Sequence, residues 1–197
     1  MIIYYLLMRL RDENKTEAIF NATIQLVNEI GFSEISISKI AKKANVSAAT
    51  IYIYFENKED MLKECYLKSK RLMSDSVIKG VDNTGSTRQQ FENYTRNFVE
   101  FIMKNSDYFL FIEQVSNSPL LQNWCLDESS NLFTPVFDMF ENGKKQLLIK
   151  QEDANLLIMY SMLPISQLAK NHIKGQFTLD ESTLNKAIQM SWDAIKA

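Results

Sequence analysis

Apolar residues recur along this chain at intervals of three and four positions, which places them on one face of an α-helix. The clearest run begins after Ser36, whose hydroxyl can accept a backbone N–H that the first turn leaves unpaired. Asn45 follows the run, and asparagine tolerates the left-handed conformation in which a chain leaves a helix. The pattern therefore predicts a short helix between Ser36 and Asn45. Its apolar positions are Ile37, Ile40, Ala41 and Ala44.

A second short helix is predicted directly after this turn, with Ser47 as its N-cap. Ile51 and Phe55 repeat at an interval of four, so they can pack back on the first helix. Two short helices joined by a tight turn form a helix-turn-helix, whose second helix reads the major groove of DNA. The opposite face carries side chains that the packing does not need, namely Ala48, Thr50, Tyr52 and Ile53.

Helical spacing recurs through the rest of the chain, and 5 glycines and 3 prolines leave little room for sheets with many tight turns. We therefore expect an all-α fold. A capping box at Thr87 and Gln90 begins one helix, Gly31 and Gly143 each end one, and Pro135 kinks or splits the helix that Gly143 ends. Beyond the two short helices, we expect helices over 14–30, 57–78, 87–105, 108–115, 120–142, from 153 onward, and from 178 or 180 to 195.

The N-terminal region is less regular. Asn14 and Glu17 resemble a capping box, so we place the start of the first long helix at Asn14. Residues 1–8 are nearly all apolar but fall short of the roughly 20 residues of a membrane span, and their positive charges follow the apolar run, unlike those of a secretory signal. We interpret residues 1–11 as an irregular N-terminal extension, with Met8 as an alternative start. The other interpretation is a continuation of the first helix.

The two C-terminal helices are both amphipathic. In the first we expect the apolar side chains to face inward and Pro164 to bend the helix; the second carries a narrow, regular seam. Such a pair suits an antiparallel dimer bundle, and it fits an intramolecular core as well. The inward positions of the first are Leu156, Leu157, Tyr160, Leu163 and Leu168. The seam of the second is Leu184, Ala187, Ile188, Ser191, Trp192 and Ile195.

Charge is unevenly distributed along the chain. Residues 36–58 carry four lysines and one glutamate, a local charge of +3 in a chain whose net charge is −2, which leaves −5 for the remainder. A basic island in an acidic protein fits a phosphate-binding surface. A solvated, lysine-rich helix face accounts for the charge equally well.

The segment from Lys15 to Tyr66 resembles the N-terminal domain of the tetracycline-repressor (TetR) family of transcription regulators, above all in the core Val46-Ser47-x-x-Thr50-Ile51-Tyr52-x-Tyr54-Phe55-x-x-Lys58-Glu59. The resemblance implies a three-helix helix-turn-helix head at 12–66 and a helical ligand-binding and dimerisation body at 67–197. It also implies a homodimer formed through the last two helices, bound to double-stranded operator DNA and responsive to a small-molecule effector.

The resemblance carries roles onto the head. Ser36, Thr50, Tyr54 and Lys58 match positions that commonly hold phosphates, and Lys39 and Lys42 are secondary candidates. Base contacts fall to the outer face of the second helix, which is made of Ala48, Tyr52 and Ile53, with Ser47 and Ala49 at the margin. Because alanine and isoleucine can touch only a thymine methyl or a sugar, part of the readout should depend on DNA shape.

For the body, the resemblance implies an apolar pocket that takes a hydrophobic or aromatic ligand. Aromatic stripes are more often packing than pocket, so each candidate is weighed against a place in the core. Ligand binding would favour a body conformation that moves the two heads off their groove spacing, so that a repressor leaves a near-palindromic operator. The pocket candidates are Phe98, Phe101, Phe111, Trp124, Phe137 and Met162.

Other chemistry is poorly supported. A single histidine, His172, and the two distant cysteines Cys65 and Cys125 offer no zinc site of usual spacing, and no phosphate loop or nucleophile elbow is present. We therefore expect no metal, no cofactor and no enzyme activity, and two such thiols suggest a reducing cytoplasm. Two other classes stay open: a small-molecule-binding helical protein that does not bind DNA, and an all-α enzyme.

Overall fold

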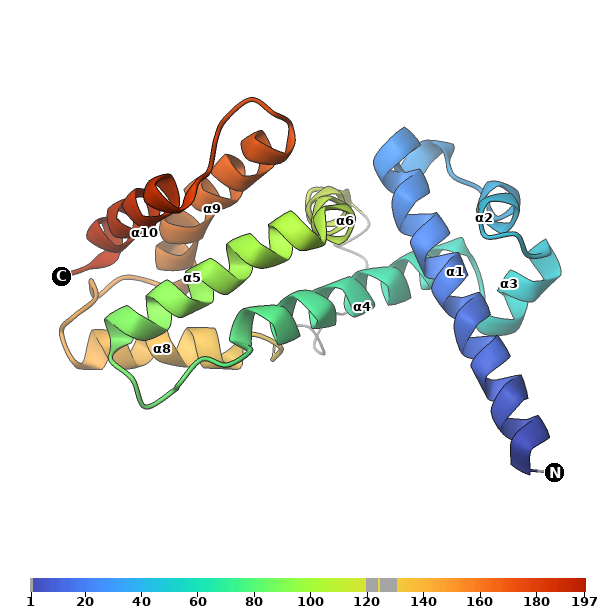
Figure 1. The fold of residues 1–197 in the computed structure, drawn as a ribbon, viewed down its shortest axis with the longest axis horizontal. Coiled ribbons are helices and arrows are strands. Elements are labelled where there is room, and N and C mark those ends of the chain that lie inside the picture. Colours follow the sequence, from blue (N-terminus) through green and yellow to red (C-terminus); the bar gives the residue numbers. More distant parts are fainter. Residues whose placement is uncertain (1, 120–123, 125–130) are drawn as a thin grey trace. The chain divides into compact units, whose positions relative to one another are not determined.

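The computed structural model of the protein describes residues 2–119, 124 and 131–197, with side chains from residue 13 onward (Figure 1). Within these residues the fold is all-helical, as the periodicity predicts, apart from an isolated β-bridge between Ile149 and Lys196. The helices are α1 (Ile2–Glu34), α2 (Ile37–Lys43), α3 (Ala48–Tyr54), α4 (Lys58–Ile78), α5 (Thr87–Lys104), α6 (Ser106–Ser116), α8 (Thr134–Lys145), α9 (Ala154–Ile173) and α10 (Glu181–Ile195).

The chain divides into two compact units. The first unit comprises Met1–Lys70 and Asp107–Cys125, and so contains α1, α2, α3, most of α4, and α6. The second unit comprises Arg71–Ser106 and Leu126–Ala197, and contains the end of α4 together with α5, α8, α9 and α10. Of the helix predicted over 120–142, residues 120–123 and 125–130 lie outside the described residues, and residues 134–142 belong to α8.

Helix α1 corrects two expectations about the N-terminal region. It begins at Ile2 rather than at Asn14, so residues 2–11 continue the helix instead of forming an irregular extension. Residues 2–13 contain no glycine or proline and several strong helix formers, and this propensity outweighs the capping signal at Asn14. At the other end, Gly31 leaves the helical conformation with φ 77° and ψ 170°. Residues that carry a Cβ atom rarely adopt such a positive φ.

The first unit is built around the inner faces of its helices. Ile19 and Val27 of α1, Ile40 of α2 and Ile51 of α3 are fully buried, so these inner faces form one core. Polar contacts also join α1 to α6, which returns to this unit from later in the chain. Tyr108 donates to Asn21 (2.9 Å), and Asn28 accepts from Gln114 (2.9 Å) and donates to the Asp107 carbonyl (2.8 Å).

Helix α5 forms the centre of the second unit. Its capping box is made by Ser86 and Gln89, one residue before the predicted pair of Thr87 and Gln90. Both pairs have the spacing that a capping box requires, so the spacing alone does not distinguish them. Thr87 is instead buried. On the inner face of α5, Phe91, Tyr94, Phe101 and Ile102 are buried, whereas Phe98 is half-buried.

Helix α8 confirms one expected break and corrects another. Pro135 lies in the first turn of α8, where a missing N–H is harmless, so the proline does mark a helix boundary. Gly143, however, does not end α8, which continues to Lys145. Leu147 turns the chain instead, with a φ of 57°.

Asp153 caps α9, which begins where predicted, and Asp180 rather than Thr178 caps α10. Asp153 accepts the backbone N–H of Asn155 (2.9 Å), and Asp180 accepts that of Thr183 (2.8 Å). In α10 the expected seam is confirmed at its buried positions Ala187, Ile188, Ser191 and Ile195, while Leu184 and Trp192 are half-buried. Pro164 stands inside α9.

The expected inward face of α9 is wrong at most of its positions. Leu157 is buried, and Leu168 is half-buried. Leu156, Tyr160 and Leu163 are exposed by 43%, 67% and 54%, because the core of the second unit takes a neighbouring face of α9 that contains Leu157, Ser161 and Ile165.

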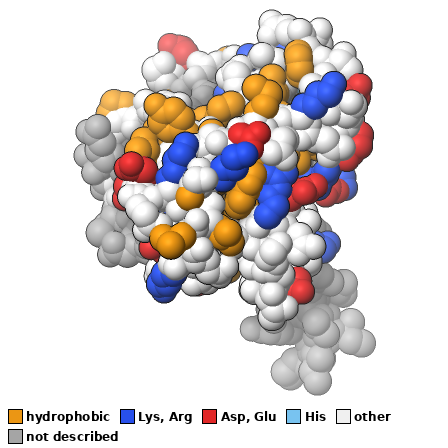
Figure 2. All heavy atoms as spheres, turned by 90° about the vertical axis from the view of Figure 1, so that its left-hand side faces the viewer, with side chains coloured by type: hydrophobic (Ala, Val, Ile, Leu, Met, Phe, Trp, Pro, Cys, Tyr) orange, Lys and Arg blue, Asp and Glu red, His pale blue; other side chains and the backbone are white. Residues whose placement is uncertain are grey.

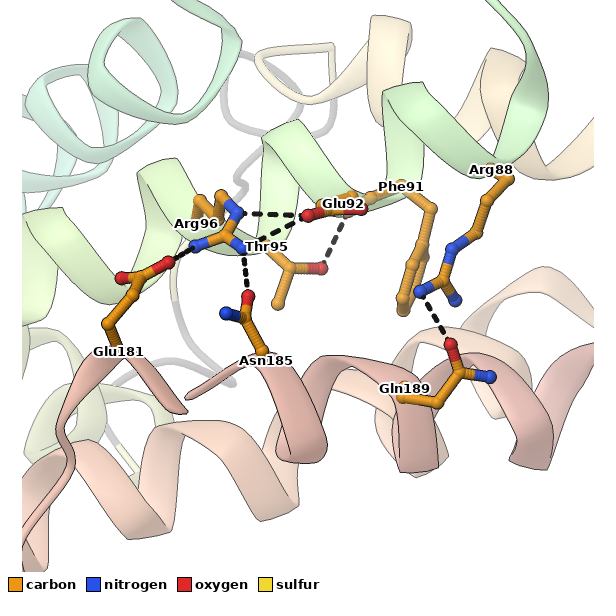
Figure 3. Close-up of polar contacts among 8 residues, drawn as sticks. All are labelled: Arg88, Phe91, Glu92, Thr95, Arg96, Glu181, Asn185 and Gln189. Carbon is orange, nitrogen blue, oxygen red and sulfur yellow. Dashed lines mark hydrogen bonds and ion pairs between the residues drawn. The ribbon is translucent and has the colours of Figure 1, made fainter. Parts of the chain in front are cut away.

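Polar side chains fasten α10 to α5 (Figure 3). Arg96 of α5 donates to Glu181 at 2.8 Å and also to Asn185, while Glu92 accepts two further bonds from the same guanidinium at 3.1 and 3.0 Å. Near the start of α5, Arg88 donates to Gln189 (2.9 Å). These bonds lie along the rim of an apolar contact and fix the register of α10 on α5.

Candidate nucleic-acid interface

Helix α3 begins where the sequence predicts. The Ser47 hydroxyl accepts the backbone N–H of Thr50 (3.0 Å) and lies 2.8 Å from the Thr50 hydroxyl. The preceding turn is set by Asn45, whose φ is 54°, and by a bond from the Val46 N–H to the Ala41 carbonyl (2.9 Å). These local bonds fix the angle at which α3 leaves α2.

The inner side of α3 is anchored by two apolar residues. Ile51 is fully buried, and Phe55 is 5% exposed and packs edge-on against Phe20 of α1, with ring centroids 5.7 Å apart. The outer side faces solvent, where Tyr52 is 58% exposed and Ile53 is 76% exposed. The structure thus separates an anchoring face from an accessible face, as the sequence pattern predicts.

The other outer residues of α3 differ in accessibility. Ala49 is exposed, whereas Ala48 and Thr50 are half-buried. Tyr54 is half-buried as well, and its ring centroid lies 6.4 Å from that of Phe55, so packing holds part of this ring while the rest is accessible. Together these residues make a short surface whose polar side-chain groups are the hydroxyls of Thr50, Tyr52 and Tyr54.

Helix α2 brings a second group of candidates close in sequence to α3. Ser36 is exposed and caps α2 by accepting the N–H of Lys39 (3.3 Å). The Lys39 ammonium donates to the Glu34 carbonyl (2.6 Å). Lys58, at the start of α4, is half-buried and donates to the Ile35 carbonyl (3.4 Å). Lys39 and Lys58 therefore both reach back to the segment that leads into α2.

Ion pairing changes the picture of the basic island. Lys43 forms an ion pair with Glu29 of α1 at 2.7 Å, so this lysine is partly neutralised by a residue that lies outside the basic stretch. Lys42 is exposed, and its backbone carbonyl accepts the N–H of Asn45 (3.3 Å). Sequence reasoning missed the ion pair with Glu29, because a charge count within 36–58 does not include acidic residues on another helix.

The buried thiol of the first unit is an unsuitable nucleophile. Cys65 of α4 is fully buried, and burial raises the pKa of its thiol far above the ordinary value. A thiol that stays protonated is a poor nucleophile and a poor metal ligand. Among the described side chains, moreover, no group of three histidine, cysteine or acidic residues is arranged to hold a metal ion.

The pocket candidates are spread over both units. Phe111 and Trp124 belong to the first unit and are buried, and Trp124 donates its indole N–H to Glu59 (3.2 Å). The other four belong to the second unit, where Phe101 is buried and the remainder are half-buried. A groove of about 450 Å³ in the second unit includes Phe101 but none of the other candidates. It is lined by Ser76, Lys79, Gly80, Asn97, Glu100, Phe101, Lys104 and Asn105.

Exposed apolar side chains form a regular stripe along α9. Met159 is 55% exposed and lies between the exposed Leu156, Tyr160 and Leu163, a spacing that keeps all four on one side of the helix. Figure 2 views the molecule from the side on which the C-terminus lies in Figure 1, and on this face hydrophobic side chains are interspersed with charged ones. No described helix is both long and apolar enough to cross a membrane.

Two family models match the chain. Residues 19–65 match the model described as bacterial regulatory proteins, tetR family, and residues 87–196 match the tetracyclin repressor-like C-terminal domain. The first match covers the helices that build the α3 surface, and the second covers more than half of the chain.

Relatives match over nearly the full length. An HTH-type transcriptional regulator of Haemophilus influenzae is 27% identical over 96% of this chain and 100% of its own. The crystal structure of a TetR-family transcription regulator from Marinobacter aquaeolei is 26% identical, with a TM-score of 0.86 over 95% of this chain and 98% of its own. A TetR-family structure from Vibrio parahaemolyticus is 29% identical, with a TM-score of 0.79 over 93% of this chain and 99% of its own.

The exposed face of α3, the helix-turn-helix that presents it and the two family matches agree with one another. The protein belongs to the TetR family of DNA-binding transcriptional regulators, a family of non-enzymes.

Proposed function

We propose that the protein is a ligand-responsive repressor that binds a near-palindromic operator as a homodimer and leaves it when a hydrophobic or aromatic small molecule binds the body. The observation that carries the DNA-binding part is the asymmetry of α3. Ile51 and Phe55 anchor the helix from behind, while Tyr52 and Ile53 are left accessible at 58% and 76%. A helix fastened in this way can enter a major groove without losing its own core.

Within this proposal the head residues divide by task. Ser36, Thr50, Tyr54 and Lys58 contact phosphates and fix the position of the head, with Lys39 beside them. Ala48, Tyr52 and Ile53 face the base edges, with Ser47 at the margin. Lys42, the other secondary candidate, has an exposed side chain that can reach a phosphate. The functional division is then a DNA-binding domain at 12–66 and a ligand-binding and dimerisation domain at 67–197.

The proposed dimer is supported by the apolar stripe of α9. Four side chains exposed by 43–67% on one side of a helix are costly in water, and a second copy of the same helix would cover them. A two-fold dimer presents two α3 helices, which suits half-sites about 34–36 Å apart along the duplex. Operator binding also requires access to the chromosome, which is consistent with a cytoplasmic protein.

Ligand response requires differential binding. A small molecule that bound both body conformations equally would change nothing, whereas induction of about 100-fold needs roughly 2.7 kcal/mol of preference for the DNA-free conformation. The aromatic and methionine side chains Phe98, Phe101, Phe111, Trp124, Phe137 and Met162 are the proposed source of apolar contacts. A corepressor would need the opposite preference, so titration of ligands against operator-bound protein reports the sign.

Selection of bound duplexes from a random library tests the DNA-binding part and yields the operator sequence. With that duplex, Tyr52→Ala and Lys58→Ala should each weaken binding about tenfold or more in a gel-shift assay while the protein stays folded. Lys145→Ala, which removes an exposed lysine in the last turn of α8, is the matched control and should bind as the wild type does. If both head variants bind like the wild type, the assignment of the site is wrong.

A further inference from the structure

The outer face of α3 exposes a large apolar side chain where a base could contact it. Ile53 is 76% exposed, more than any other large apolar side chain among the described residues. It lies in the last turn of α3, next to Tyr52 and one turn beyond the exposed Ala49. Single exposed apolar side chains are common on protein surfaces, so it is the position of Ile53 on the outer face of α3 that makes it a candidate for a contact with DNA.

The polar groups of α3 are largely engaged with one another. The Ser47 hydroxyl caps Thr50 and lies within hydrogen-bond distance of the Thr50 hydroxyl, at 2.8 Å. Between Ser47 and Tyr54 the sequence contains no arginine, lysine, asparagine, glutamine or acidic residue. The accessible side chains of α3 therefore offer methyl groups and hydroxyls, including the Tyr52 and Tyr54 phenols, but no amide or charged group.

The major groove presents one apolar group to such a surface. Thymine carries a C5-methyl, whereas the other bases present hydrogen-bond donors, acceptors or a bare C–H at the groove edge. We propose that Ile53 determines sequence specificity by packing against a thymine methyl in each half-site, so that the operator is a duplex with thymine opposite the last turn of α3. This inference rests on the proposed function, because it needs α3 in the groove.

The experiment uses the full-length protein and the duplex that it selects from a random library. Each thymine of the half-site is replaced in turn by deoxyuridine, in both half-sites, which removes the methyl and leaves every hydrogen-bonding group in place. At one position this change should weaken wild-type binding about 10- to 20-fold, since each lost methyl contact is worth about fourfold and the dimer makes two. Fluorescence anisotropy gives the dissociation constants.

The variant Ile53→Ala identifies the side chain responsible. It should bind the thymine duplex more weakly than the wild type does and should bind the thymine and deoxyuridine duplexes equally well. Leu147→Ala is the matched control, because Leu147 is 72% exposed and lies in the second unit, and it should keep the full deoxyuridine effect. Thermal unfolding confirms that both variants fold.

Two results would overturn the inference while leaving the proposed function intact. One is a wild-type protein that binds its selected duplex but responds to no deoxyuridine substitution, as a contact with a sugar or with DNA shape alone would give. The other is an Ile53→Ala variant whose binding still weakens in full when thymine is replaced by deoxyuridine, which would assign the contact with the thymine methyl to Tyr52 or Ala49. Failure to select or bind any duplex would overturn the proposed function and this inference with it.

Discussion

Gly143 and Ile149 lie so close together that a Cβ atom on Gly143 would be 2.6 Å from Cδ1 of Ile149. The same atom would lie 2.8 Å from Cγ2 of Thr87, so the position is crowded from two sides. Ile149 is fully buried and pairs with Lys196 in the β-bridge, and Thr87 is 4% exposed. Both side chains are buried and have little room to move away, which explains a glycine in the last turn of α8.

Gly143→Ala should therefore destabilise the protein. The crowding costs about 1–3 kcal/mol, and it outweighs the roughly 0.5–1 kcal/mol that alanine would gain over glycine in a helix. Unfolding in urea, followed by circular dichroism, measures the change. Asn142→Ala, at an exposed position of the same helix, is the control and should be neutral or slightly stabilising. A Gly143→Ala protein as stable as the wild type would contradict the close packing.

The helix-turn-helix could be predicted from the sequence because its signals are local. Ser36, Asn45, Ser47 and Asp180 each act within four residues of their own position, and the structure confirms each cap or turn. Gly143 misled the prediction for the opposite reason. Whether a glycine ends a helix or admits a neighbour depends on Ile149 and Thr87, and no local rule reports that crowding.

The faces of α9 show a second limit of sequence reasoning. Periodicity groups the apolar positions of a helix on one side, but it does not show which of them are buried in the folded monomer. Leu157 and Tyr160 belong to the same amphipathic pattern, yet Leu157 is 4% exposed and Tyr160 is 67% exposed. The sequence of α9 contains more apolar positions than one buried face can hold, and this excess was the available signal that the monomer leaves a second apolar face exposed. In the head, the ion pair between Lys43 and Glu29 was beyond prediction because it joins two helices.

Arg96 should contribute to the stability of the second unit. Its guanidinium joins Glu92 of α5 to Glu181 and Asn185 of α10, so Arg96→Ala removes several bonds at once (Figure 3). Because the pair is partly exposed and screened by water, we expect a loss of about 1–2 kcal/mol in the free energy of unfolding. Arg96→Lys should recover less than half of it, since lysine lacks the planar fork.

Equilibrium unfolding of these two Arg96 variants at low and high salt checks the assignment. The wild-type advantage over Arg96→Ala should shrink at 1 M salt, because exposed ion pairs are screened. Lys104→Ala is the comparison, since its pair with Glu100 lies within α5 alone and should contribute little. An Arg96→Ala protein that unfolds like the wild type would show that the bonds do not hold α10 on α5.

The buried thiol of Cys65 predicts a dependence of stability on pH. Burial raises the pKa of this thiol in the folded protein, so above the unfolded value of about 8.5 the unfolded chain loses a proton that the folded protein keeps. The stabilising contribution is complete below that pH and is lost as the pH rises. The free-energy advantage of wild type over Cys65→Ala should therefore fall by up to about 1.4 kcal/mol per pH unit between pH 8.5 and 9.5.

Urea unfolding at several pH values measures that slope, and a Cys125→Ser background leaves Cys65 as the sole thiol. In the same background, iodoacetamide should label Cys65 only as fast as the protein opens. Fast labelling of the native protein, or an equal pH dependence in wild type and Cys65→Ala, would contradict the burial of this side chain.

The last prediction concerns the apolar stripe of α9 and separates assembly from DNA reading. Tyr160→Glu places a charge in the middle of the stripe, where burial against a second copy would leave it unpaired, at a cost of several kcal/mol. We expect this variant to be a folded monomer by sedimentation velocity and to bind the selected operator at least tenfold more weakly. Ile53→Glu makes the same change at a comparably exposed position of the head, 76% against 67%. It should remain a dimer and lose operator binding, because the charge would face the groove. A Tyr160→Glu protein that sediments as a dimer would exclude this face of α9 from the interface, even if Ile53→Glu behaves as expected.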